Sequence, residues 1–179
     1  MLLFYKKHHL TDYDLMIESK SPQLITIENS LETNAQILDA SHWGEDFSWE
    51  QLQSISHYFK PYAASKGTVI YEEGEIGTSM GIIVKGTIGV YKNNKLISTL
   101  RVGRTFGEMS VIDAQPRSAT ARAERETVFL SLDKASMLIL ADKHPTLAFK
   151  IVWNISRALS QRLRLTSAQL VEFLESNVI

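Results

Sequence analysis

The sequence predicts a mainly β fold with flanking helices (α+β): a sandwich or barrel of short strands, a short N-terminal helix, a hinge helix and a long C-terminal helix. Six short runs rich in β-branched residues lie between residues 68 and 132. Glycine or paired asparagine separates several of these runs, and most have no helical pattern between them. After residue 133 the pattern becomes helical.

The length and composition bound the possible functions. With 179 residues, the chain has room for one domain of ordinary size and a helical appendage. Hydrophobic residues make up 44% and charged residues 22%, so we expect a packed core. The longest apolar runs fall far short of the about 20 residues that a membrane-spanning helix needs, and the N-terminus lacks the pattern of a secretory signal. These features favour a soluble, cytoplasmic protein that has no membrane partner.

The charge balance and the absence of cysteine exclude further classes. A net charge of −1 gives the chain no overall positive potential that would attract a polyanion, so direct DNA binding is disfavoured. Without cysteine there is no disulfide, thiolate nucleophile or zinc-thiolate site. His8 and His9 are an adjacent pair near the terminus, which we interpret as solvated, and residues 68–132 contain no histidine for a metal-dependent barrel enzyme.

The N-terminal part differs in charge from the rest. Residues 1–46 hold three lysines against eight acidic side chains, a balance of −5. They contain a possible strand at residues 24–27 and a possible helix at residues 29–40. We interpret residues 1–46 as an acidic N-terminal extension of uncertain structure.

The predicted barrel with its N-terminal helix occupies residues 47–133. Ser48 and Gln51 have the spacing of a capping box, and the apolar residues after them, up to Phe59, repeat on one helical face until Pro61. The predicted strands then cover residues 68–71, 81–84, 87–91, 95–100, 118–123 and 127–132.

Residues 134–179 are predicted to form the hinge helix and the long C-terminal helix. Asp133 is the expected N-cap of the hinge helix, and Pro145 the expected first residue of a final helix that reaches about Ser176. Seam positions three and four residues apart predict dimerisation; they are Phe149, Val152, Ser156, Leu159, Leu163, Thr166, Leu170 and Phe173. A second apolar line, of Leu147, Ile151 and Ile155, would pack on the barrel. The alternative is a helix buried only against its own domain.

The segment at residues 106–119 carries the chemistry. Gly107 allows close approach of a ligand, and residues 108–112 have the length of one helical turn with free N–H groups. Arg117 offers a fork of donors to an anion, and Glu108 an acceptor to a sugar hydroxyl. Together they suit a nucleotide, whereas each residue taken alone is more simply interpreted as part of a surface ion pair between Glu108 and Arg117.

This segment resembles the phosphate-binding cassette of cyclic nucleotide-binding domains, which has the form Phe-Gly-Glu, a run of small apolar residues, and Pro-Arg with a small residue. Upstream matches are Gly74-Glu75, residues 82–88, and Val102-Gly103 before Phe106. The resemblance covers about residues 47–176. The chain is similar to the family of the bacterial cAMP receptor protein and the regulatory subunit of protein kinase A, but we expect no helix-turn-helix after the long helix.

The resemblance implies a double-stranded β-helix, or jelly-roll barrel, that binds a cyclic nucleotide without hydrolysing it. Glu108 would hold the ribose 2′-hydroxyl and Arg117 the cyclic phosphate, with backbone N–H groups of Gly107, Ser110 and Ser118 completing the cradle. The implied ligand-binding residues are Phe106, Gly107, Glu108, Met109, Ser110, Arg117, Ser118, Ala119, Thr166 and Ser167. No catalytic residue, metal or cofactor is implied besides the ligand, cAMP or cGMP.

Four residues depart from the family pattern or leave it open. Ser118 stands where alanine is common in cAMP binders, so the preferred base stays open. Gly81 stands where a bulky residue is more usual. Thr166 and Ser167 match the base-contacting pair of the bacterial receptor only with one extra helical turn, because an ungapped count places Arg162 and Leu163 there.

The expected function is a stand-alone regulatory sensor. It would bind a cyclic mononucleotide, cAMP more readily than cGMP, and would signal through movement of its C-terminal helices in a homodimer or toward a protein partner. Two alternatives are a degenerate domain that serves as a scaffold without ligand, and the sensor part of a transcription regulator that acts through a partner.

Overall fold

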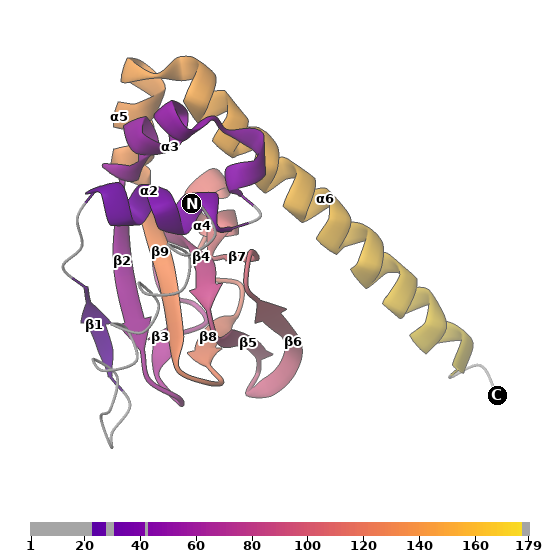
Figure 1. Cartoon of the computed structure of the whole chain (residues 1–179). Helices are drawn as coiled ribbons and strands as arrows, with labels where there is room; N and C mark the ends of the chain where they lie inside the picture. Colours follow the sequence, from indigo (N-terminus) through magenta and orange to yellow (C-terminus); the bar gives the residue numbers. More distant parts are fainter. Residues whose placement is uncertain (1–22, 28–30, 42, 177–179) are drawn as a thin grey trace.

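The computed structural model of the chain describes residues 23–27, 31–41 and 43–176. His8, His9 and His42 lie outside these residues. Helices gather at one end of two sheets, and the last helix projects beyond them (Figure 1). The elements in chain order are β1 (Leu24–Thr26), α2 (Leu31–Asp39), the 3-10 helix η2 (Gly44–Asp46), α3 (Trp49–Ser56), β2 (Phe59–Ala64), β3 (Val69–Tyr71), β4 (Ser79–Lys85), β5 (Thr87–Lys92), β6 (Lys95–Arg101), β7 (Thr105–Phe106), α4 (Glu108–Asp113), β8 (Thr120–Ala123), β9 (Thr127–Asp133), α5 (Lys134–Lys143) and α6 (Pro145–Ser176).

The strands form two antiparallel sheets that face each other, as the predicted jelly roll requires. One sheet has the order β1-β2-β9-β4-β7 and the other the order β3-β8-β5-β6. Ile83, Ile88, Phe106 and Phe129 belong to a buried cluster that fills the space between the sheets. The opposite face of β2, β4 and β9 packs against the helices in a second, larger cluster. The mainly β fold with flanking helices is therefore confirmed.

The predicted helix boundaries follow from local capping. Ser48 and Gln51 form the complete capping box at the start of α3. The Asp133 side chain accepts a hydrogen bond from the Ser136 N–H at the start of α5. Pro145 opens α6, in which its missing N–H removes no helical hydrogen bond. Ile151 and Ile155 are fully buried on the side of α6 that packs on the core, as the second apolar line predicts.

The segment after α3 corrects the expected helix. The helix ends at Ser56, and residues 59–64, with Pro61 among them, form strand β2. This strand pairs with β9 from Phe59↔Leu132 to Ala64↔Thr127. The short strand β7 was also absent from the prediction. Neither strand has a clear local pattern, because pairing with distant strands determines both.

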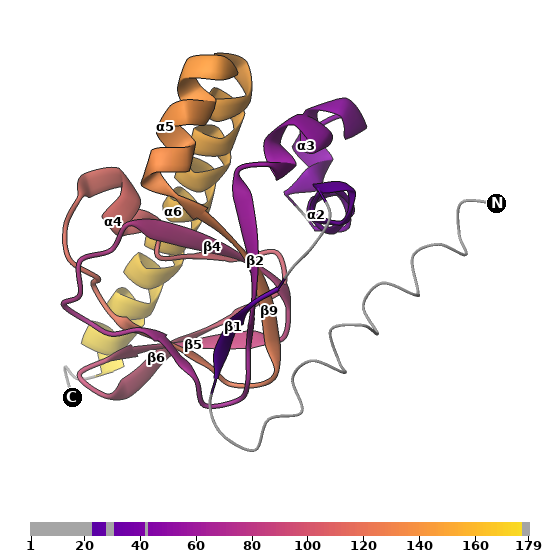
Figure 2. The same cartoon turned by 90° about the vertical axis from the view of Figure 1, so that its left-hand side faces the viewer.

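The acidic extension contributes directly to the first sheet. Strand β1 pairs with β2, with Leu24 opposite Ala64 and Thr26 opposite Tyr62 (Figure 2). The Ile27 N–H donates to the carbonyl of Pro61 at 3.0 Å. Residues before the predicted barrel are therefore part of the folded sheet.

The outer side of α6 is exposed along its length. Predicted seam residues such as Phe149, Leu163, Leu170 and Phe173 all lie on the surface of this single chain. None of the helices in the described residues is both long and apolar enough to cross a membrane. Within the same residues, no group of three or more histidine, aspartate or glutamate side chains could hold a metal ion.

Candidate functional site

The phosphate-cassette segment folds as one helical turn between two strands. Strand β7 leads into Gly107, which has φ 74° and stands at the N-cap of α4. A side chain would be strained at this φ, and its Cβ would lie 2.5 Å from Nη1 of Arg117. Glycine at this position therefore lets the Arg117 side chain lie directly against the backbone, whereas the predicted close approach of a ligand stays a prediction.

Arg117 occupies a narrow slot beside α4. Its side chain is only 7% exposed, and its Nη1 donates to the carbonyl of Gly107 at 2.7 Å. The guanidinium carbon lies 4.1 Å from the centre of the Tyr71 ring. A Cβ at Gly77 would be 2.5 Å from Nε of Arg117. Burial lowers the pKa of Arg117 and raises that of Tyr71 to about 12.

Glu108 is the most buried charged residue of the cassette, with 0% of its surface exposed. Its Oε1 accepts a hydrogen bond from Nη1 of Arg162 at 2.5 Å. Arg162 Nη2 also donates to the carbonyl of Thr105 at 2.9 Å. The other carboxylate oxygen, Oε2, has no hydrogen-bond partner among the described residues. A buried acceptor without a donor is unfavourable, so a donor that reached Oε2 would stabilise the site.

An aromatic cavity of about 260 Å³ adjoins Arg117 on the Tyr71 side. Its walls include a row of rings: Phe106 stacks on Tyr71 at 6.1 Å between ring centres and meets Phe129 edge to face at 5.2 Å. The Phe106 ring lies over Gly81, where a Cβ would be 2.3 Å from it. The unusual glycine therefore makes room for Phe106. Leu24 of β1 also lines this cavity.

The remaining cassette residues divide into buried and exposed groups. Phe106, Ser110 and Ala119 are buried. Met109 and Ser118 are exposed, and the Ser118 hydroxyl lies 3.8 Å from the Met109 sulfur. Only Phe106 and Arg117 of the predicted ligand-binding residues line the aromatic cavity.

On the long helix, the structure brings Arg162 rather than Thr166 or Ser167 to the cassette. Thr166 and Ser167 are exposed in this chain, so their contact with a base stays a prediction. The ungapped count along the sequence puts Arg162 and Leu163 at the base-contacting positions, but it did not predict the contact of Arg162 with Glu108. Tyr71 and Gly77 have no local pattern that marks them as site residues, because their role depends on where the Arg117 side chain lies.

Comparison with known proteins shows what this chain is similar to. Residues 63–144 match the family model described as cyclic nucleotide-binding domain. A cyclic nucleotide-gated potassium channel from Rhizobium etli is 36% identical over 97 residues, 54% of this chain and 27% of the channel. The cyclic AMP receptor protein of Thermus thermophilus is 28% identical over 120 residues, 64% of this chain and 54% of the receptor. The chain thus spans only part of each of these relatives.

A solved structure supports the same assignment. A cyclic nucleotide-binding domain from Methylobacillus flagellatus superposes with a TM-score of 0.74 and 26% identity, and the match covers 83% of this chain and 88% of that one. The similarity in fold extends beyond the segment that the family model matches. Residues 63–144 of this chain therefore belong to the cyclic nucleotide-binding domain family.

Proposed function

We propose that this chain binds a cyclic mononucleotide, cAMP in preference to cGMP, and acts as a regulatory sensor rather than as an enzyme. The observation that carries the proposal is the Glu108 carboxylate, which is fully buried, keeps one oxygen without a partner and stands in the same cassette as Arg117. The proposal requires no metal or resident cofactor. It places the protein in the cytoplasm, with neither DNA nor a membrane as a direct partner.

The two charged residues would divide the ligand between them. Oε2 of Glu108 would accept a hydrogen bond from the ribose 2′-hydroxyl, because a hydroxyl can satisfy a buried acceptor without adding charge. Arg117 would donate to the cyclic phosphate with the N–H groups that do not bond Gly107. Backbone N–H groups of Gly107, Ser110 and Ser118 would complete the phosphate contacts. None of these groups acts as a nucleophile in the proposal.

The preference for cAMP rests on named relatives. The receptor from Thermus thermophilus is named for cyclic AMP, and a structure of a protein kinase A regulatory subunit with bound cAMP superposes with a TM-score of 0.57 at 25% identity. Another relative, a protein kinase from Plasmodium berghei that is 32% identical over 117 residues, is named for its dependence on cGMP instead. A titration with both nucleotides is therefore part of the test.

The proposed signal passes through α6. Arg162 of this helix bonds to Glu108, the residue that would hold the ribose. A ligand that donates to Glu108 would either weaken or strengthen the hydrogen bond between Glu108 and Arg162 that attaches the helix. In either case the ligand would bind with different affinities to two positions of α6, which is what a ligand-driven switch requires. Thr166 follows Arg162 by one helical turn on the same face, so it is the next side chain that a ligand extending along the helix would meet.

We also propose that the exposed side of α6 joins two copies of the chain. The support is the run of apolar seam residues exposed on a single chain, among them Leu163, Leu170 and Phe173. Sedimentation equilibrium tests this part separately: Leu163→Glu together with Leu170→Glu should convert a dimer to a monomer. A wild-type monomer at all concentrations would contradict it.

Calorimetric titration with cAMP and cGMP tests the ligand site. Arg117→Ala should weaken binding by about 1.5–3 kcal/mol, roughly 10- to 150-fold, the scale of a hydrogen bond to a charged group. Glu108→Gln should have a similar or smaller effect. Arg122→Ala is the matched control, because Arg122 also lies over a tyrosine ring, 4.4 Å from the centre of Tyr91, but outside the cassette. Equal affinity in the wild type and all three variants would reject the site.

A scaffold without ligand is the second candidate, and one observation favours it. Arg117 is already packed over Tyr71 and hydrogen-bonded to the carbonyl of Gly107. Part of the hydrogen-bonding capacity of its guanidinium is therefore used within the chain. If neither nucleotide produces heat or a thermal shift, while Arg117→Ala destabilises the fold, Arg117 has a structural role and the scaffold is the better description.

A further inference from the structure

The main chain at Arg117 is held by a turn between β3 and β4. The N–H of Arg117 donates to the carbonyl of Glu75 at 2.8 Å, and its carbonyl accepts from the N–H of Gly74 at 2.9 Å. Gly74 has φ 87°, a conformation that glycine adopts without strain. Residues 73–75, which we call the supporting turn, therefore bond both main-chain polar groups of Arg117.

These bonds also set the direction of the Ser118 N–H, one of the proposed phosphate donors. The Arg117 carbonyl and the Ser118 N–H belong to one planar trans peptide, so they point in opposite directions. Because Gly74 holds the carbonyl on the side of the supporting turn, the Ser118 N–H points away from that turn. A displacement of the supporting turn would therefore move two proposed phosphate donors, the Arg117 guanidinium and the Ser118 N–H.

The supporting turn is itself attached through Glu73, and both oxygens of this carboxylate are bonded. Oε1 accepts from Nζ of Lys92, and Oε2 accepts from the N–H of Asn93 at 3.2 Å. The Glu73 N–H donates to Oγ1 of Thr120 at 2.9 Å. The hydrogen bond from Lys92, followed by that from Asn93, lowers the pKa of Glu73, so its carboxylate is ionised in neutral solution.

The tip of the β5–β6 hairpin supplies these donors. Asn93 and Asn94 have φ 49° and 61°, the left-handed conformation that a two-residue hairpin turn requires and that asparagine tolerates. Lys92, directly before this turn, also donates from Nζ to the Ser118 carbonyl at 2.8 Å. One ammonium group thus connects the hairpin, the supporting turn and the end of the cassette.

We propose that Lys92 is a positioning residue for the phosphate site, which acts through Glu73 and through the Ser118 carbonyl. The inference rests on the proposed nucleotide site and adds to it a residue that would not itself contact the ligand. The side chains of Lys92 and Glu73 are 47% and 31% exposed, so their ion pair contributes little to the stability of the whole fold. Its effect should appear in the ligand affinity, because a binding site weakens when the groups that support it shift.

Hydrogen exchange in the nucleotide-free protein tests the attachment itself. Lys92→Met keeps the apolar stem of the side chain but removes the ammonium group that bonds Glu73 and Ser118. The amides of Gly74 and Arg117 should then exchange about three- to tenfold faster, because the supporting turn opens more often. Unchanged exchange at both amides would overturn the proposal, whatever the protein binds.

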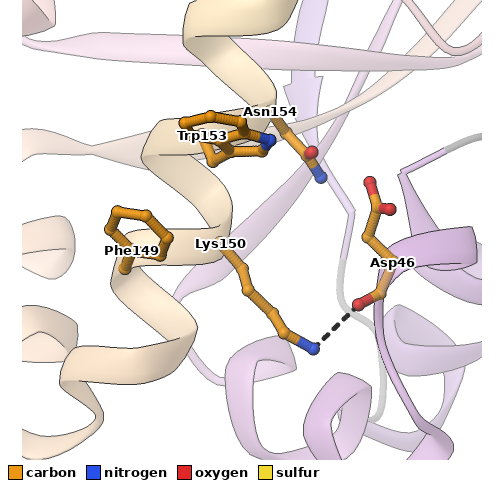
Figure 3. A pocket seen from close by; sticks show the side chains of 5 residues that line it. All are labelled: Asp46, Phe149, Lys150, Trp153 and Asn154. Atoms are coloured by element: carbon orange, nitrogen blue, oxygen red, sulfur yellow. Dashed lines mark hydrogen bonds between the residues drawn. The ribbon is translucent and has the colours of Figure 1, made fainter.

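Lys150→Met is the matched control for hydrogen exchange. Nζ of Lys150 likewise bonds one side chain and one main-chain carbonyl, Oε1 of Gln51 at 2.9 Å and the carbonyl of Asp46 at 2.9 Å (Figure 3). These contacts connect α6 to the N-terminal helical part and do not include the supporting turn. Lys150→Met should therefore leave the Gly74 amide unaffected, and equal acceleration in both variants would indicate a general loosening and refute the inference.

Calorimetric titration with cAMP and cGMP tests the consequence for binding. Lys92→Met should weaken binding about three- to tenfold, the scale of one net hydrogen bond. Lys92→Arg, which can donate to both acceptors, should restore most of the affinity. Lys95→Met is the control for charge, because Lys95 pairs with Lys92 across the hairpin and its loss keeps the contacts to Glu73 and Ser118. Equal weakening by Lys92→Met and Lys95→Met would mean that charge alone matters and would rule out positioning.

A double variant shows whether Lys92 and Glu73 act as one unit. Glu73→Gln should weaken binding on its own but should add no further loss to Lys92→Met, and additive losses would contradict the proposal. The wild-type titration keeps the two proposals apart. A wild type that binds neither nucleotide rejects the nucleotide site, whereas binding of equal strength in the wild type and Lys92→Met rejects only the positioning role.

Discussion

Arg162 and Glu108, 54 positions apart in the sequence, form an ion pair in which the carboxylate is almost completely buried and the arginine side chain is 38% exposed. The pair attaches the middle of the longest helix to the cassette between β7 and β8. The first helical turn of the cassette and the position of α6 therefore depend on the same contact.

Arg162→Gln should destabilise the protein, because it leaves the buried charge of Glu108 without its partner. Removing one member of a fully buried pair costs about 3–5 kcal/mol, and the partial exposure of Arg162 reduces the expected loss to about 2–3 kcal/mol. Urea denaturation measures this loss. The double variant Glu108→Gln with Arg162→Gln should recover part of it. An unchanged free energy of unfolding in Arg162→Gln would show that the pair contributes nothing.

Gly77→Ala should weaken nucleotide binding, by about tenfold if one charged hydrogen bond is lost. Its Cβ would lie 2.5 Å from Nε and 2.6 Å from Cζ of Arg117, so the guanidinium has to move. Gly89→Ala is the matched control, because its Cβ would crowd the Glu124 and Tyr91 side chains instead. Calorimetry should show reduced affinity in the first variant only, and equal affinity in both would contradict the prediction.

Tyr71 should make stability fall with rising pH in alkaline solution. Burial raises the pKa of Tyr71 from 10.0 to about 12, although Arg117 acts in the opposite direction. Between these values the unfolded chain loses the phenol proton while the folded chain keeps it. The stabilising contribution is therefore complete below pH 10 and is lost as the pH rises toward 12. Tyr71→Phe should make the free energy of unfolding less steep in this interval, and identical slopes would count against a buried phenol.

Thr68→Val should loosen strand β1 without unfolding the protein. The Thr68 hydroxyl donates to the carbonyl of Gln23 at 3.0 Å, just before β1 begins. Losing this bond, worth about 1 kcal/mol, should speed hydrogen exchange of the Ile27 amide by roughly fivefold. Thr120→Val, which removes a hydroxyl that accepts from Glu73 N–H, should leave the Ile27 amide unaffected. Equal exchange rates in wild type and Thr68→Val would disprove the role of this bond.

The parts of the fold that could be predicted are those that depend on neighbouring residues. The capping residues Ser48, Asp133 and Pro145 contact groups within one helical turn, so their spacing is visible in the sequence. Strand β2 was missed because Phe59 continues an apolar helical repeat, whereas its pairing partner Leu132 lies 73 residues away. The local sequence pattern contains no information on such a distant pairing, so it cannot distinguish this strand from a helix.

The site shows the same division. The helical turn at Glu108 was predictable, because Gly107 and the residues after it have the composition of the cassette. The contact between Arg162 and Glu108 was not, because an arginine on an exposed helix usually faces water. The same holds for Tyr71, which reads as an ordinary strand residue until the guanidinium of Arg117 is placed over its ring.

The exposed end of α6 has a mechanical consequence. Every residue from 163 to 176 is exposed in this chain, so no part of the helix beyond Arg162 is buried against the domain. That exposed portion is about 21 Å long, and a tilt of about 10° at Arg162 would displace its tip by about 4 Å. A small tilt at the contact between Arg162 and Glu108 would thus become, at the tip of the helix, a displacement large enough for another protein to detect.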